Sequence, residues 1–191
     1  MRLPHQQNEL NRALSLNLNM TAIITESPQF FTATILEWKK LLKPEKYKDT
    51  IISSLQFLVE NNRVKVNAFV IMDNHIHLIW QMMAGIKSEA AQRDFMKYTA
   101  QKIKQDLIKS HPAVLAHFKV NAKDREYQFW ERNALSIELG TLEMLKQKLE
   151  YIHYNAVLAG LCNLPEEYKY STARFYETGV NDWDFVTHYT E

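Results

Sequence analysis

The stretch Val66–Trp80, VNAFVIMDNHIHLIW, decides the fold because two apolar runs flank a tight turn at Asp73–Asn74. Asp and Asn are typical turn formers, so the two runs are predicted to pair as an antiparallel hairpin. In the second run, His75 and His77 are two residues apart, and on a strand their side chains point to the same face. Neutral imidazole is a common ligand of divalent metals, so this pair predicts half of a metal site. The alternative interpretation, two polar residues on a solvated face, stays open at this point.

Helix and strand patterns alternate along the rest of the chain. Apolar residues that recur every three or four positions predict helices, and β-branched and aromatic runs predict strands. In chain order we expect a strand over 28–36, a helix over 44–62, strands over 64–72 and 75–83, a helix from Ser88 to before Pro112, a strand over 128–132 and a helix over 141–160. This order predicts an α+β fold of the ferredoxin-like or RRM-like class, with a single antiparallel sheet and helices packed on one face.

Composition and charge limit the class of protein. The chain has 191 residues, of which 46% are hydrophobic and 24% are charged, as is usual for a globular domain. A net charge of +1 means that any binding to nucleic acid depends on a local patch. Cys162 is the only cysteine, and no apolar run is long enough to cross a bilayer, so we expect a cytoplasmic protein. We divide it into an N-terminal arm over 1–27, one domain over 28–178 and a C-terminal tail over 179–191.

The last predicted helix carries a second pair of chemical groups. Tyr151 and Asn155 are four residues apart and therefore project from one helix face. A phenol attacks phosphorus when a divalent cation polarises the phosphate, and an amide oxygen is able to complete a ligand shell begun by two histidines. The alternative interpretation is that Tyr151 lies at the rim of an amphipathic helix and that Asn155 is a surface residue or a cap.

Several other residues have a functional and a structural interpretation. Trp80, Phe129 and Trp130 are candidates for stacking on unpaired bases, although core packing is the commoner use of such residues. His153 is two residues from Tyr151 and so faces away from it, which weakens a role in proton transfer or DNA contact. Asp73 is expected to shape the turn before the histidines.

Taken together, the motifs resemble those of the REP-associated tyrosine transposases, within the wider single-tyrosine HUH transposases. The resemblance covers Phe30–Tyr176, about three quarters of the chain. It includes the WKK that follows the first strand, the HIH of the hairpin, the FWER segment, YIHYNAVLAGL in the last helix and LPEEYKYSTARFYETG after it. The resemblance implies the ferredoxin-like HUH endonuclease fold, in agreement with the predicted element order.

The resemblance also implies roles for individual residues. His75, His77 and Asn155 would hold Mg²⁺ or Mn²⁺, and Tyr151 would be the nucleophile that forms a 5′-phosphotyrosine. The implied substrate is single-stranded DNA, from a hairpin or a repeat, and related enzymes act as monomers or homodimers. This chain departs from the family at Ala156, where a proline is usual, so the local helix geometry is expected to differ.

Basic residues are candidates for contacts with DNA. Lys97, Lys102 and Lys104 lie on one predicted helix, where they either contact phosphate or are simply solvated. Arg174 belongs to the motif after the last helix and is expected either to bind DNA phosphate or to form a salt bridge.

Three functions remain open from the sequence. The first is a metal-dependent transposase or endonuclease that cleaves and rejoins single-stranded DNA through Tyr151. The second is a catalytically silent regulator, derived from a transposase, that binds single-stranded nucleic acid. The third is a metal-dependent nuclease without a covalent intermediate, which leaves Tyr151 without a role. Tyr154 is the substitute nucleophile, but Leu158 stands at its +4 position where Asn155 follows Tyr151.

Overall fold

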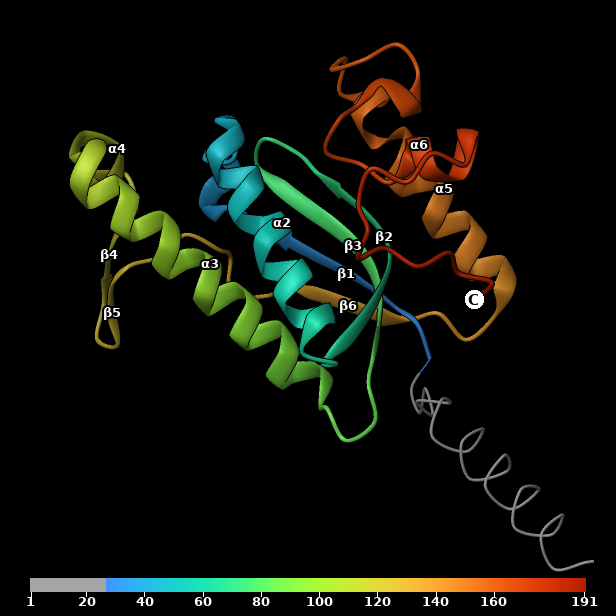
Figure 1. The fold of residues 1–191 in the computed structure, drawn as a ribbon. Helices are drawn as coiled ribbons and strands as arrows, with labels where there is room; N and C mark the ends of the chain where they lie inside the picture. The colour runs from blue at the N-terminus through green and yellow to red at the C-terminus, as the bar shows by residue number, and fades with distance from the viewer. Residues whose placement is uncertain (1–26) are drawn as a thin grey trace, which may run out of the picture.

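The computed structural model describes residues 27–191, and its helices and strands are shown in Figure 1. The arm predicted over 1–27 lies outside the described residues, except for residue 27. The strands are β1 (Gln29–Thr34), β2 (Val64–Ile71), β3 (His75–Met82), β4 (Lys119–Ala122), β5 (Arg125–Tyr127) and β6 (Leu135–Glu138). The α-helices are α2 (Glu45–Glu60), α3 (Ser88–Ser110), α4 (Pro112–Ala116), α5 (Leu142–Leu158) and α6 (Ala173–Thr178), with short 3₁₀ helices at Leu36–Trp38 and Pro165–Glu167.

The four-stranded sheet has the order β2-β3-β1-β6, and all its neighbouring strands are antiparallel. The helix α2 connects β1 to β2, and α3 begins the connection from β3 to β6. The hairpin turns at Asp73–Asn74 as predicted, since Met72 N–H donates to the His75 carbonyl. A sheet in this order with two crossover helices is the ferredoxin-like arrangement, so the predicted fold class is confirmed.

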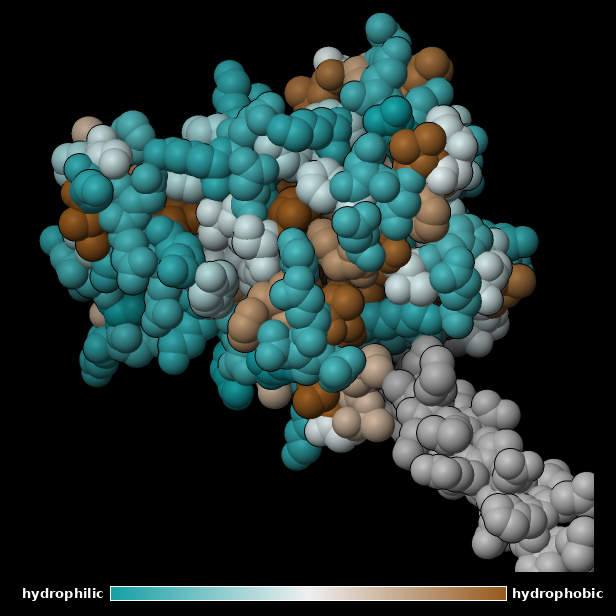
Figure 2. Space-filling view, in the orientation of Figure 1, coloured by the Kyte–Doolittle hydropathy of each residue, from teal (hydrophilic) through white to brown (hydrophobic). Residues whose placement is uncertain are grey.

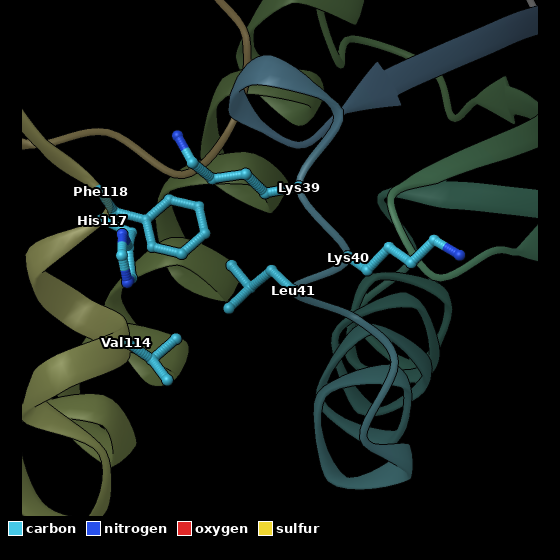
Figure 3. Close-up of a pocket in the computed structure, with 6 residues that line it drawn as sticks. All are labelled: Lys39, Lys40, Leu41, Val114, His117 and Phe118. Atoms are coloured by element: carbon cyan, nitrogen blue, oxygen red, sulfur yellow. The ribbon is translucent and has the colours of Figure 1, made fainter.

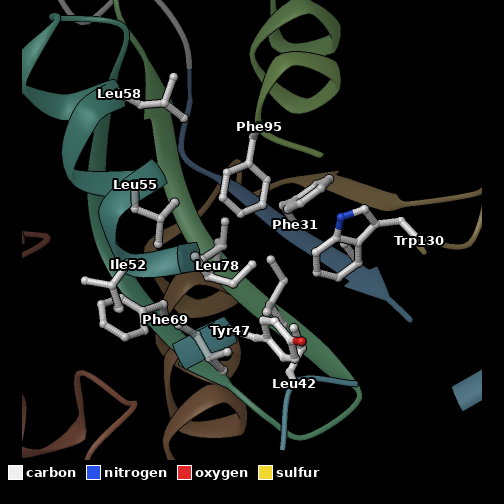
Figure 4. Packing of buried hydrophobic residues seen from close by; sticks show 14 of the residues in the cluster. Phe31, Leu42, Tyr47, Ile52, Leu55, Leu58, Phe69, Leu78, Phe95 and Trp130 are labelled. Atoms are coloured by element: carbon white, nitrogen blue, oxygen red, sulfur yellow. The ribbon is translucent and has the colours of Figure 1, made fainter. Parts of the chain in front are cut away.

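The prediction that all helices pack on one face of the sheet is wrong. The helices α2 and α3 cover one face over a core shown in Figure 4, which includes Phe31, Leu55, Leu78 and Phe95. The helix α5 lies on the opposite face (Figure 1) and forms a second core with residues of β1, β2 and β3. The physical reason is that β2 is buried at every position but one, so this strand needs cover on both faces.

The strand predicted over 128–132 is also wrong. Trp130 forms only an isolated bridge with Ile35, and the fourth strand of the sheet is β6, a few residues later. Phe129 and Trp130 have strand-forming side chains, but both are buried in the first core. The edge strand β6 is largely exposed and therefore lacks the apolar run by which strands are recognised.

The predicted boundaries of the other elements are confirmed to within a residue or two. Thr141 caps α5 by accepting a hydrogen bond from Met144 N–H at 3.2 Å. Gly160 follows α5 with a φ of 69°, a conformation that favours glycine. Residues 179–191 lie against β2, since Thr187 N–H donates to the Val66 carbonyl and Val186 is buried in the first core.

The outer surface is mainly polar in the orientation of Figure 2, where hydrophobic side chains form small separate areas. This pattern is usual for a domain that buries most of its large apolar residues in its own core. Within 27–191, no helix is both long enough and apolar enough to cross a membrane.

The helix α5 is tied to the following segment by a buried histidine. His153 Nε2 lies 3.1 Å from Thr172 Oγ1, and Thr172 Oγ1 also contacts the backbone of Phe69 in β2. Burial lowers the pKa of His153 from its ordinary 6.5 to about 4. His153 is therefore neutral in the folded protein at neutral pH and acts in packing, away from Tyr151.

This burial predicts a pH-dependent loss of stability. Well above pH 6.5, His153 is neutral in both the folded and the unfolded protein. As the pH falls from there towards 4, the unfolded chain takes up a proton at His153 while the folded protein stays neutral at this residue. The free energy of unfolding is expected to fall by about 2 kcal/mol between pH 7.5 and 4.5 through this group. Urea denaturation of His153→Gln should show a correspondingly flatter pH dependence, whereas the exposed control His117→Gln should follow the wild type. If the free energy of unfolding of His153→Gln depended on pH in the same way as that of the wild type, this assignment would be contradicted.

Candidate active site

The strand β3 places His75 and His77 side by side on the face that α5 covers. Their ring centroids are 4.8 Å apart with an interplanar angle of 67°. The intervening Ile76 points to the opposite face and lies in the first core, as strand alternation requires. In the neighbouring strand β1, Thr32 is the register partner of His77. The alternative interpretation placed the two histidines on a solvated face of the strand. In the structure, the helix α5 covers that face.

The helix α5 brings Tyr151 and Asn155 to the same histidines. The Tyr151 ring centroid lies 5.0 Å from that of His77, and Asn155 Oδ1 lies 3.2 Å from His75 Nε2. The helix continues without interruption past Ala156, which is buried in the second core. Both Tyr151 and Asn155 therefore stay on one helix face, and the four residues singled out from the sequence meet at one place.

His77 is held rigidly and has one unused nitrogen. Its Nδ1 lies 2.7 Å from Thr32 Oγ1, and its ring stacks on Phe30 at a centroid distance of 5.3 Å. Among the described residues, its buried Nε2 has no hydrogen-bond partner. Burial, together with the positive charge of nearby groups, lowers the pKa of His77 to about 3. His77 therefore presents a neutral imidazole to the site at physiological pH.

The tautomer of His77 follows from the cost of burying an unpaired donor. If Thr32 donated its hydroxyl to Nδ1, the His77 proton would sit on the buried Nε2 without an acceptor. If Nδ1–H donates to Thr32 Oγ1 instead, Nε2 is a bare lone pair, and the half-buried Thr32 hydroxyl keeps access to water. The second arrangement costs less because buried N–H groups are rarely left unpaired.

A short relay sets the tautomer of His75. Asn74 Nδ2 donates to the Trp38 carbonyl at 3.3 Å, which turns Asn74 Oδ1 towards His75 Nδ1 at 2.8 Å. With Nδ1–H donating to Asn74, His75 Nε2 has only a lone pair to offer Asn155 Oδ1, which is itself an acceptor. Burial lowers the pKa of His75, while the contact with Asn155 acts in the opposite direction. Two acceptors that face each other at 3.2 Å are satisfied by a proton, by rotation of the amide or by a cation between them.

The site offers a metal two imidazole nitrogens and one amide oxygen. Within 27–191, no group of three or more His, Cys, Asp or Glu side chains converges in a way that could hold a metal ion. The orphaned Nε2 of His77 and the lone pairs of His75 and Asn155 form a donor set that fits a divalent cation. Because these ligands carry no charge, a bound cation would keep its full positive charge for an anionic substrate.

Lys148 lies at this site but was not among the residues predicted from the sequence. Its ammonium lies 4.9 Å from the Phe30 ring centroid and 5.7 Å from that of Tyr151. Lys148 precedes Tyr151 by three residues and Asn155 by seven, so helix spacing places all three on one face. That spacing was available in the sequence as a signal.

The structure does not bring the predicted DNA-contacting residues to this site. Lys97, Lys102 and Lys104 are on α3, which packs on the opposite face of the sheet from the histidines. Arg174 pairs with Asp182, at 3.1 Å between Nη1 and Oδ1. Whether any of the four contacts DNA stays a prediction.

The aromatic candidates Trp80, Phe129 and Trp130 are buried in the first core, as the structural interpretation expects. Trp130 Nε1–H donates to Thr99 Oγ1 inside that core. Asp73 lies in the turn before the histidines, as predicted, and forms an ion pair with the buried Lys48 at 2.9 Å.

Comparison with known proteins supports the fold. A solved structure of a REP-associated tyrosine transposase bound to a REP hairpin matches with a TM-score of 0.58, over 86% of this chain and 88% of that chain, at 17% identity. A transposase candidate from Deinococcus radiodurans is 12% identical, with a TM-score of 0.45 over 65% of this chain and 87% of that chain. No family model and no curated protein matches the sequence. The resemblance to REP-associated tyrosine transposases is thus confirmed at the level of the fold.

The hydrogen bond from His77 Nδ1–H to Thr32 Oγ1 predicts the protonation pattern of His77. Long-range ¹H–¹⁵N spectra of the wild type near pH 7 should show His77 as the neutral Nδ1–H tautomer, because Thr32 Oγ1 accepts that proton. In Thr32→Val the acceptor is lost, and the spectrum is expected to shift towards the Nε2–H tautomer. A wild-type His77 with its proton on Nε2 would contradict the proposed arrangement.

Proposed function

We propose that this protein is a metal-dependent single-stranded DNA transposase or endonuclease that cleaves and rejoins DNA through a 5′-phosphotyrosine at Tyr151. The observation that carries the proposal is the placement of the Tyr151 ring 5.0 Å from His77, on the helix face that also brings Asn155 to His75. If Tyr151 only covered the rim of the helix, the two imidazoles and the lysine beside it would have no evident role. The fold shared with a transposase supports the same class of reaction.

In this proposal His75, His77 and Asn155 hold Mg²⁺ or Mn²⁺. The buried and unpartnered Nε2 of His77 supports it, because such an atom costs free energy unless a ligand satisfies it. When bound, the cation supplies Lewis-acid polarisation of the scissile phosphate. Since none of the three protein ligands is a carboxylate, the phosphate would be the main anion at the metal.

Tyr151 carries the chemical step. Its Oη attacks the scissile phosphorus, the Oη–P bond forms, and the bond from phosphorus to the 3′ oxygen breaks. The phenol gives up its proton and the leaving 3′ oxygen gains one, so the products are a 5′-phosphotyrosine and a free 3′-OH. Lys148 stabilises the negative charge that develops on the phenol oxygen and the phosphate. Because one phosphodiester replaces another, a 3′-OH is able to reverse the step and join strands without ATP.

The proposed substrate is a DNA hairpin with unpaired flanks. The transposase that shares this fold was solved with a REP hairpin, and this supports a structured single-stranded DNA as the partner here. Tyr151 is 43% exposed, so a polymer that lies across the surface is able to reach this side chain.

A covalent adduct tests the proposed function. Incubation of the full chain with labelled hairpin DNA pools and Mn²⁺ or Mg²⁺ should give an SDS-resistant protein–DNA adduct, which Tyr151→Phe abolishes because the attacking oxygen is gone. The matched control is Tyr154→Phe, which removes an exposed hydroxyl three residues away and should keep the adduct. Binding without any wild-type adduct would support the silent regulator instead, and cleavage that survives in Tyr151→Phe would support a plain nuclease.

Lys148 is expected to accelerate adduct formation. Replacing Lys148 with Met removes a charge next to the Tyr151 ring and should slow single-turnover adduct formation about tenfold or more. Lys148→Arg should restore much of the rate, because the positive charge returns. Lys146→Met, on the same helix but exposed, is the control and should react like the wild type. An unchanged rate in Lys148→Met would exclude this role.

A further inference from the structure

Trp38 lies at the edge of the candidate site with most of its side chain in solvent. It is 62% exposed, whereas Trp80 and Trp130 are buried. Its ring centroid lies 5.6 Å from that of His75, at an interplanar angle of 67°. A large aromatic side chain that stays mostly exposed beside His75 contributes little to the core of the folded chain.

The backbone that displays Trp38 is strained. Glu37 and Trp38 have φ values of 55° and 56°, in the left-handed region that non-glycine residues rarely adopt. Glu37 N–H donates to Glu131 Oε1 at 2.7 Å, and the Trp38 carbonyl accepts from Asn74. Consecutive strained residues persist only when neighbouring segments hold them, and such strain concentrates at ligand sites. The turn therefore places an exposed indole next to His75 at an energetic cost.

A pocket begins at the residue after Trp38 (Figure 3) and has a volume of about 300 Å³. Its walls are Lys39, Lys40, Leu41, Val114, His117 and Phe118. Lys39 Nζ lies 5.5 Å from the Phe118 ring centroid, and Figure 3 shows the Lys40 ammonium pointing away from that ring. The pocket thus combines an aromatic floor with lysine side chains at its edge, one of which, Lys39, also pairs with Glu37. This combination suits a base and its phosphate.

We propose that Trp38 stacks on an unpaired DNA base next to the scissile phosphate, and that the pocket lined by Lys39 and the residues that follow it holds the adjoining nucleotide. The position of the scissile phosphate rests on the proposed function, whereas stacking requires only that the protein binds single-stranded DNA. Two features favour DNA over an apolar peptide. Lys39 and His117 line the pocket together with the aromatic ring of Phe118, and Trp38 lies against His75 of the candidate site.

The test is a cycle that pairs protein variants with abasic DNA. All proteins carry Tyr151→Phe, so that binding is measured without cleavage. The probe is a fluorescein-labelled DNA hairpin with unpaired thymidines on both sides, and each copy has a single abasic site at a different unpaired position. Binding is followed by fluorescence anisotropy at fixed salt with Mg²⁺ present. Phe57→Ala is the control, since Phe57 is 58% exposed on α2 and α2 covers the opposite face of the sheet.

We expect one abasic position to weaken binding about tenfold in the Trp38-containing protein. Trp38→Ala should bind the intact probe about tenfold more weakly and lose nothing further at that position. Trp38→Phe, which keeps an aromatic face, should retain most of the affinity and part of the sensitivity. The proposal would be overturned if Trp38→Ala bound the probe with unchanged affinity, or if the probe did not bind at all. It would also be overturned if, at every abasic position, the loss of affinity from Trp38→Ala simply added to the loss from the abasic site. If Trp38→Ala does not fold, an unaltered abasic profile in Trp38→Phe overturns it as well.

Adduct assays on the Tyr151-containing proteins separate this proposal from the proposed function. If the stacking cycle holds and no adduct forms, Trp38 is a DNA-binding residue of a silent regulator, and the stacking proposal stands. If adducts form while Trp38→Ala binds like the wild type, the stacking proposal fails and the proposed function stands.

Discussion

The packing of α5 on the second face of the sheet is the contact on which the candidate site depends. One row of α5, formed by Leu145, Leu149, Ile152 and Ala156, is buried against apolar residues of β1, β2 and β3. That row fixes the rotation of the helix and so turns Tyr151 and Asn155 towards β3. The histidines lie on β3, a central strand that is hydrogen-bonded to a neighbouring strand on each side.

The candidate site combines neutral imidazoles with a nearby positive charge. Both imidazoles are held neutral by burial, each uses Nδ1 within the protein, and each turns Nε2 into the site. Lys148 adds a positive charge, and among the described residues no group of three or more His, Cys, Asp or Glu side chains converges in a way that could hold a metal ion. Such a site repels cations less than it would if the histidines were charged, and in our proposal the cation binds there together with a phosphate.

The hairpin, the three long helices and the ferredoxin-like class were all predicted from the sequence. So were the four residues that meet at the site, namely His75, His77, Tyr151 and Asn155. These features are local: a turn at Asp73–Asn74, a period of two in β3 and a period of four in α5. The placement of α5 was missed because a continuous apolar run such as β2 does not say which helix covers which face. Trp38 was missed as a site residue because its position depends on a strained turn and on Asn74, distant in sequence.

Pulsed EPR of Mn²⁺ bound to the full chain tests most directly whether the two strand histidines and the α5 helix build one metal centre. The account predicts hyperfine coupling to ¹⁴N from two imidazoles, reduced to one in either His75→Gln or His77→Gln. Nitrogen coupling that survives unchanged in both variants, or is missing from the wild type at saturating Mn²⁺, would contradict it.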